Sequence, residues 1–273
     1  MSKFTVAVIQ TVTQPELGDT LRRAEEQVRE AAGHGAQVVA LPEMFVCPYS
    51  RHYFKIQAAL GHEGTVQELS RWAREYGVLL VGGSLPEKEG EKLYNTCFVF
   101  DKQGNIIARH RKVHLFDVDA PGLRFGESDT FSPGSEITVF DTEFGRMGVA
   151  VCFDLRFPEL FRAMAMRGAE VVFAPSQFNS GIGRVHWEPT LMLRAIDNEF
   201  YLVAPNAAAN PAFRYQPCGM SCVIDPFGEK LCMAADKGEA ILYARIDTDR
   251  VDEVRRTFPT FRRLREDVYE VAK

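Results

Sequence analysis

The two halves of the sequence repeat one order of predicted strands and helices. Three pairs of apolar segments match in turn: VAVIQ at 6–10 with VAVC at 149–152, VVALPE at 38–43 with VVFAPS at 171–176, and LLVGGS at 79–84 with YLVAPN at 201–206. Such runs of β-branched and small residues are typical of buried strands, and segments with helical spacing of apolar residues separate them. This internal duplication restricts the chain to folds built from two similar halves.

Each half is predicted to contain two principal helices and to end in a β-hairpin. The first two helices are expected to begin at Asp19, as an N-cap, and at a capping box of Thr65 and Glu68; the other two are expected over 158–168 and 186–198. The segments 101–104 and 225–228 carry Asp first and Gly fourth, which fits a type I turn. Each half therefore has the order β-α-β-α-β-hairpin.

Two helices per unit can cover only one face of its sheet, so the other face must pack against something else. The duplicate half is the obvious partner, which predicts a four-layer αββα sandwich, an α/β fold of two six-stranded sheets packed face to face. We expect a single domain over 1–273. The Arg-rich tail at 247–273 lies beyond the repeat and is expected to reach a neighbouring element or subunit.

The composition excludes several classes of function. A chain of 273 residues with 46% hydrophobic content can bury a large core, and its net charge of -5 is spread without the basic stripe that nucleic acid binding needs. No apolar run has transmembrane length, and the N-terminus MSKFTVAVIQ lacks a signal-peptide core. We therefore expect a cytoplasmic protein that binds neither membranes nor nucleic acid. The six cysteines form no CxxC pair, and Cys218 and Cys222 lack a second pair with zinc spacing, so no metal site is predicted.

Three chemically capable residues stand at or just past predicted strand ends. Glu43 follows VVAL, Lys112 closes the first hairpin, and Cys152 follows GVAV. Ligand and catalytic sites of such sheets gather at the carboxyl ends of strands, where these side chains would supply a base, a cation and a nucleophile. Taken singly, each has an ordinary alternative: a buried small hydrophobe for the cysteine, a loop cap for the glutamate and a solvated charge for the lysine.

The segments around these residues resemble a known family. LPE at 41–43, HRKVHLFD at 110–117 and VAVCFDLRFPEL at 149–160 are similar to the three signature blocks of the nitrilase superfamily of carbon–nitrogen hydrolases, in the same order. The resemblance implies an αββα subunit, a homodimer with an eight-layer αββα–αββα stack, a small-molecule amide substrate and no metal or organic cofactor. A second family glutamate corresponds to Glu127 in RFGES.

The resemblance also implies the roles of individual residues. Cys152 would attack the carbon of an amide, and Glu43 would take the thiol proton, deliver it to ammonia and then activate water. Lys112, with the backbone N–H of Phe153, would stabilise the oxyanion, and Glu127 would orient Lys112 and the substrate or water. Asp154, Arg156 and Glu159 would form structural ion pairs.

Within the superfamily, RKVHLFDVDAPG, the block at 177–188 and FPTFRRLREDVY resemble the branch of omega-amidases and deaminated-glutathione amidases, with FDVDAPG nearer the omega-amidase form. These enzymes hydrolyse terminal amides such as those of 2-oxoglutaramate and 2-oxosuccinamate. The sequence departs from the branch at SGIGRV (180–185) and NPAFRYQPCGMS (210–221), which puts the substrate in doubt.

Seven residues, most of them in or near these loops and one, Tyr49, in the loop after Glu43, are candidates for substrate binding. Arg184, Arg214 and Tyr215 are candidates for holding a substrate carboxylate, because arginine binds carboxylates bidentately; the alternative is that they are exposed loop residues. The full set is Tyr49, Phe178, Asn179, Arg184, His186, Arg214 and Tyr215.

Other functions were compared with an omega-amidase-like activity. Within the superfamily, a deaminated-glutathione amidase, an N-carbamoyl amino acid amidohydrolase, an aliphatic amidase and a lactam hydrolase stay open. A true nitrilase is disfavoured because CFDLRFPE differs from the CWEN type. Phosphatase chemistry fails because Cys152 and Arg156 are four apart with no glycine loop to hold phosphate. A catalytically silent binding module would not explain the intact Glu43, Lys112 and Cys152.

Overall fold

The computed structural model of the chain describes residues 2–120, 123–260, 263–265 and 267–269. The first sheet runs in the order β15-β1-β2-β3-β5-β4, and β6 pairs with the other edge of β5. Its strands are β1 (Lys3–Gln10), β2 (Val38–Ala40), β3 (Leu79–Val81), β4 (Leu85–Glu89), β5 (Lys92–Phe100), β6 (Ile106–Arg111) and β15 (Ala240–Asp247).

The second sheet has six strands in the order β14-β13-β12-β11-β10-β9. These are β9 (Thr138–Thr142), β10 (Gly145–Val149), β11 (Val171–Phe173), β12 (Tyr201–Ala204), β13 (Cys222–Ile224) and β14 (Lys230–Met233). A separate two-stranded ribbon joins β7 (Asp117–Ala120) to β8 (Leu123–Gly126).

The strand pairing shows the duplication predicted from the sequence. Each sheet has three parallel strands, β1-β2-β3 and β10-β11-β12, followed by an antiparallel hairpin. Each first parallel strand also has an antiparallel outer neighbour, β15 beside β1 and β9 beside β10, which the sequence analysis did not predict. The first sheet has seven strands and not six, because β4 continues past β3 and pairs with the half of β5 that β3 leaves unpaired.

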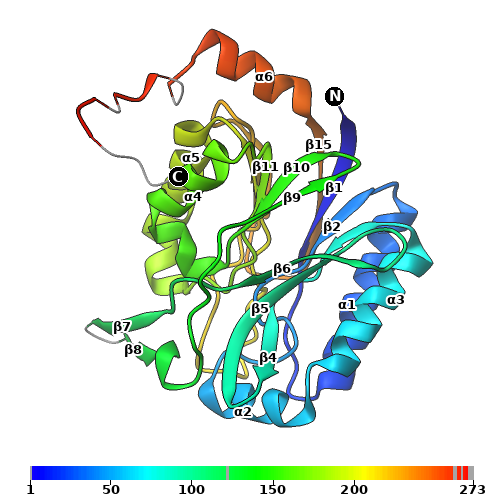
Figure 1. Ribbon diagram of the computed structural model, residues 1–273. Helices are drawn as coiled ribbons and strands as arrows, with labels where there is room; N and C mark the ends of the chain where they lie inside the picture. Colours follow the sequence, from blue (N-terminus) through cyan, green and yellow to red (C-terminus); the bar gives the residue numbers. More distant parts are fainter. Residues whose placement is uncertain (1, 121–122, 261–262, 266, 270–273) are drawn as a thin grey trace.

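The two sheets pack face to face, with helices on the outside (Figure 1). Alternate residues of β1 separate the layers: Val6 and Val8 belong to the core shared with the second sheet, whereas Ala7 and Ile9 pack in the core with α1 and α3. Figure 1 shows α1 and α3 covering one outer face and α4 and α5 covering the other. The αββα sandwich is therefore confirmed.

The main helices are α1 (Leu17–Gly33), α2 (Arg51–Leu60), α3 (Glu63–Tyr76), α4 (Pro158–Met166), α5 (Ser180–Asn198) and α6 (Thr248–Thr257), with short 3-10 turns η1 (Glu127–Asp129) and η2 (Cys152–Arg156). Three helices begin earlier in the chain than the sequence analysis predicted. The helix α1 begins two residues before Asp19, α3 begins two residues before Thr65, and α5 begins six residues before His186. The sequence analysis predicted no helix at the position of α2. No helix in the described ranges is long and apolar enough to span a membrane.

Candidate active site

Four predicted side chains meet at one end of the two sheets. Glu43 lies just past β2, and Lys112 directly follows β6. Glu127 is the first residue of η1, and Cys152 is the first residue of η2. Their exposed fractions are 0%, 1%, 0% and 7%. The duplication accounts for part of this convergence. The strands β2 and β10 each belong to the three parallel strands of their own sheet, and the carboxyl ends of these strands lie at the same edge of the sandwich.

Lys112 binds both glutamates directly. Its ammonium nitrogen Nζ donates to Oε1 of Glu43 at 2.7 Å and to Oε2 of Glu127 at 2.8 Å. The Glu127 carboxylate also accepts from the backbone N–H of Phe116 at 2.7 Å, which fixes its orientation. A buried carboxylate or ammonium is tolerated only when it is paired and hydrogen-bonded, and all three charges meet that condition here.

Two residues that the sequence analysis did not select complete the cluster. The amide nitrogen of Asn95, on β5, lies 2.9 Å from Oε1 of Glu43 and 2.9 Å from Oε1 of Glu127. The backbone N–H of Gln177 donates to Oε2 of Glu43 at 2.9 Å. Glu43 is therefore held at both of its oxygens.

Cys152 occupies a sharp turn between β10 and η2. Its φ of 45° lies in the left-handed region, which is strained for a residue with a side chain and is held by the surrounding structure. The backbone N–H of Cys152 donates to the carbonyl of Pro175 at 2.9 Å, and the buried Asp154 accepts from the N–H of Val151 at 2.8 Å. These bonds hold the thiol out of the strand.

The surroundings set the protonation states of the cluster. Burial raises the pKa of the Cys152 thiol well above its usual value, Glu43 raises it further, and Lys112 lowers it in part. Burial also raises the pKa of Glu127, against the opposing effect of Lys112. Burial alone disfavours the Lys112 ammonium, but the negative charges of Glu127 and Glu43 outweigh this and raise its pKa. At rest, the cluster therefore holds a neutral thiol beside a charged lysine.

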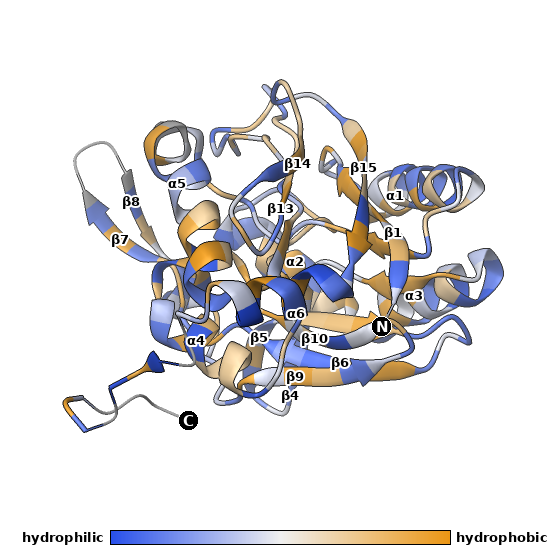
Figure 2. Ribbon diagram, turned by 90° about the horizontal axis from the view of Figure 1, so that it is seen from above, coloured by the Kyte–Doolittle hydropathy of each residue, from blue (hydrophilic) through white to orange (hydrophobic). Residues whose placement is uncertain are grey.

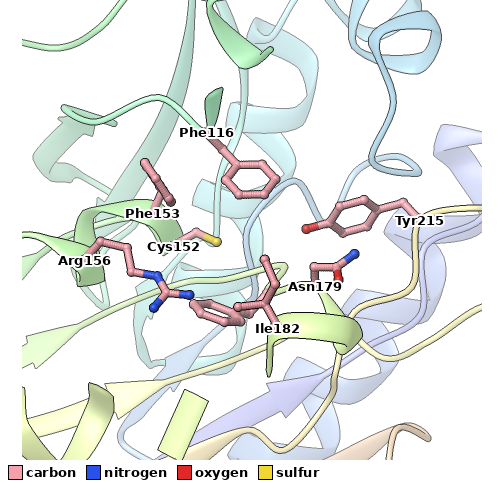
Figure 3. A pocket seen from close by; sticks show the side chains of 8 residues that line it. Phe116, Cys152, Phe153, Arg156, Asn179, Ile182 and Tyr215 are labelled. Atoms are coloured by element: carbon pink, nitrogen blue, oxygen red, sulfur yellow. The ribbon is translucent and has the colours of Figure 1, made fainter. Parts of the chain in front are cut away.

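A pocket of about 290 Å³ opens above Cys152. Figure 3 shows the sulfur of Cys152 facing a space between Phe116, Arg156 and Tyr215. The walls are mainly apolar, and the lining residues are Phe116, Cys152, Phe153, Arg156, Phe178, Asn179, Ile182 and Tyr215. A space of this kind suits a small molecule with an apolar stem and one charged group.

Arg156 corrects one expectation. It was assigned to a structural ion pair, but its guanidinium lines the pocket, lies over the Phe178 ring at 4.8 Å and donates to Nδ1 of His186 at 2.9 Å. Asp154 pairs instead with His110 and His114. Partial burial lowers the pKa of Arg156, but a guanidinium group keeps its positive charge in proteins.

The predicted substrate-binding residues divide into two groups. Phe178, Asn179 and Tyr215 line the pocket, and Tyr49 stacks on Tyr215 from behind, with ring centroids 4.7 Å apart. His186 and Arg214 are not among its lining residues. His186 is exposed and binds Arg156, Arg214 is exposed, and Arg184 lies in α5 with its side chain outside the described part of the structure. Their roles in binding stay predictions.

The fold and this cluster define a class of αββα proteins in which a cysteine, a lysine and two glutamates lie together at the edge of two facing sheets. Residues 5–256 match the family model of the carbon-nitrogen hydrolases, so the chain belongs to this family, within the nitrilase superfamily. It is a hydrolase of carbon–nitrogen bonds.

Individual relatives indicate the branch of the family that the chain resembles. The omega-amidase NIT2 of Danio rerio is 42% identical over 272 residues, covering 99% of this chain and 98% of that protein. The omega-amidase NIT2 of Homo sapiens is 41% identical, with 99% and 98% covered. The crystal structure of Saccharomyces cerevisiae Nit3, a member of branch 10 of the nitrilase superfamily, has a TM-score of 0.88 and 35% identity, covering 96% of this chain and 97% of that one. The family resemblance and the omega-amidase-like branch are thus confirmed.

Proposed function

We propose that this enzyme is an omega-amidase that hydrolyses the terminal amide of a small carboxylate-bearing amide, such as 2-oxoglutaramate or 2-oxosuccinamate, to the dicarboxylate and ammonia. The observation that carries the proposal is the combination of a cysteine next to a Lys-Glu-Glu cluster with an arginine on the wall of the same small pocket. Full-length similarity to proteins named omega-amidase supports the same reaction.

The first half of the reaction forms a thioester. The Sγ of Cys152 bonds to the amide carbon while its proton passes to Glu43, which suits a thiol that is neutral at rest. The carbonyl oxygen takes the electron pair and is stabilised by the Lys112 ammonium and the N–H of Phe153. The oxyanion then re-forms the carbonyl, the C–N bond breaks, and Glu43 gives its proton to the departing ammonia.

The second half releases the acid. A water molecule gives a proton to Glu43 and its oxygen bonds to the thioester carbon. As the tetrahedral intermediate collapses, the C–S bond breaks and the thiolate regains a proton from Glu43. Glu127 keeps Lys112 in place throughout, because its carboxylate binds the ammonium at 2.8 Å.

Arg156 is the group we assign to the carboxylate of the substrate. Its side chain reaches the pocket from the same turn as Cys152, and Phe178 and His186 hold its guanidinium. An arginine on an apolar wall binds a carboxylate strongly, because little water competes for it. Amides without a carboxylate would lack this contact.

A substrate panel tests the proposal. Ammonia release should be fastest with 2-oxoglutaramate or 2-oxosuccinamate, and at least tenfold slower in kcat/KM with neutral aliphatic amides, because the carboxylate contact is expected to contribute about 1.4 kcal/mol or more. N-carbamoyl amino acids and deaminated glutathione also carry a carboxylate, so faster hydrolysis of either of them, or of a lactam, measured by product formation, would contradict the omega-amidase assignment. A preference for neutral amides would contradict the carboxylate assignment. It would leave another superfamily amidase as the function.

Replacing Arg156 by glutamine should raise KM for carboxylate-bearing amides by about tenfold to a hundredfold, as expected for the loss of a charge-assisted hydrogen bond of about 1.5–3 kcal/mol. Neutral amides should be affected much less. The exposed Arg245 on β15, which does not line the pocket, is the matched control for a lost positive charge when it is replaced by glutamine. Equal effects of Arg156→Gln on charged and neutral amides would remove Arg156 from the carboxylate site.

We also propose a homodimer of single-domain, cytoplasmic subunits. The outer face of α5 carries Val185 and Leu193, which are 61% and 51% exposed, and such side chains on a helical layer are suited to packing against a second copy. Figures 1 and 2 show the described chain beyond α6 projecting from the body, where it would reach a neighbouring subunit. Sedimentation should give twice the 30.7 kDa chain mass, and Leu193→Asp should reduce it to the monomer mass; a monomer at every concentration would contradict the dimer.

A further inference from the structure

Asn95 contacts every ionic member of the catalytic cluster. The residue is fully buried in β5. Its side-chain nitrogen lies 2.9 Å from Glu43 and 2.9 Å from Glu127, and its backbone carbonyl accepts from the N–H of Lys112 at 2.8 Å. Among the described residues, Lys112 is the other side chain that hydrogen-bonds both glutamates.

The chemistry of an amide fits this position. An amide nitrogen has two hydrogens and no charge, so it can donate to two carboxylates at once without titrating. The orientation follows from the contacts, since the amide oxygen in its place would face two carboxylate oxygens. Two carboxylates that share a site normally compete for one proton, and each donor that binds their ionised forms weakens this competition.

We propose that Asn95 is a positioning residue that keeps Glu43 and Glu127 as hydrogen-bond acceptors around Lys112, so that Glu43 stays free to take the proton of Cys152. This inference rests on the proposed function for the role of Glu43. It goes beyond that function in assigning a role to Asn95, which is not among the residues that line the pocket.

Titration of the cluster should change when Asn95 is lost. The hydrogen bond from Asn95 lowers the pKa of Glu127, in opposition to burial. Removing it should therefore move the acid limb of the activity profile to higher pH. The other titratable groups that face this cluster are Lys112, Glu43, Cys152 and the buried phenols of Tyr49 and Tyr215. Glu87, near the same strand, binds the hydroxyl of Thr96 at 2.7 Å.

The test replaces Asn95 by leucine, which has similar size and no donor, and by serine, which keeps one donor. Asn198→Leu is the matched control, because Asn198 is 1% exposed, also uses its amide nitrogen as a donor and lies at the far end of α5. For Asn95→Leu we expect kcat to fall about tenfold to a hundredfold and the acid limb of kcat/KM to move up by about one pH unit, as loss of one charge-assisted hydrogen bond implies. KM should change less than twofold. Asn95→Ser should be intermediate.

A second readout separates this inference from the substrate assignment. The rate at which iodoacetamide alkylates Cys152, measured against pH, depends on proton removal from the thiol and not on the amide used. Asn95→Leu should slow it at neutral pH and shift its profile. If both profiles match wild type, or if Asn198→Leu changes them equally, Asn95 has only a structural role. Should Asn95→Leu not fold, the same criteria apply to Asn95→Ser.

Discussion

Replacing Cys152 by alanine is expected to lower kcat by at least about 10⁴-fold while the protein stays folded. Cys152 provides the only thiol among the described residues that line the pocket, and loss of a nucleophile in covalent catalysis removes the pathway through the acyl-enzyme. Glu43, Lys112 and Glu127 would remain in contact, because their hydrogen bonds do not include the sulfur. Binding of the substrate should therefore survive.

The measurement is ammonia release under saturating 2-oxoglutaramate, with thermal unfolding and substrate binding by calorimetry on the same samples. Cys97→Ala is the matched control, since Cys97 is a fully buried cysteine in the core between the sheets. That control should cost some stability and leave turnover close to wild type. Activity of Cys152→Ala within about tenfold of wild type would contradict the thioester mechanism.

Much of the fold follows from local sequence because buried parallel strands leave a simple signal. Continuous apolar runs place β2, β11 and β12 where they were expected, and the duplication predicts how the two sheets pack. The strands β9 and β15 left no such signal. They lie on the outer sides of β10 and β1, are only partly buried, and carry mixed polar residues.

Helix boundaries depended on tertiary packing that the sequence does not display. The segment before His186 contains Gly181 and Gly183 and was read as a loop. It is helical because Asn179 caps it, with its side chain accepting from the N–H of Gly181, and because Gly183 lies against Cys218, where a Cβ would come within 2.7 Å of the sulfur. Glycine there serves close packing and not flexibility.

The candidate site was predictable only where strand ends coincide with reactive residues. Glu43, Lys112 and Cys152 each follow an apolar run, which is visible locally. Asn95 lies inside a strand, and its contacts join residues 52 and 32 positions away along the chain. Arg156 depends on His186 of α5, 30 positions away, for its orientation. Such residues become apparent only when distant elements are brought together.

Replacing Lys112 by methionine is expected to destabilise the fold by about 3–5 kcal/mol and to abolish turnover. Methionine keeps most of the volume, but Glu43 and Glu127 would be left as two buried carboxylates without their cation, and an uncompensated buried charge is costly. The exposed Lys102, which pairs with Glu143 at the surface, is the control; Lys102→Met should change stability by about 1 kcal/mol or less.

The loss should depend on pH in a definite direction. Lys112 now opposes the effect of burial on the pKa of Glu127, so its removal raises that pKa further above the unfolded value. A carboxyl group of raised pKa favours the folded state at low pH, and this contribution is lost as pH rises through the folded pKa. Denaturant unfolding of Lys112→Met should therefore show a smaller deficit near pH 5 than near pH 8, and adding Glu127→Gln should recover part of the stability at pH 8 without restoring turnover. A deficit that is equal at both pH values would mean that Lys112 stabilises the fold by packing and not by its charge.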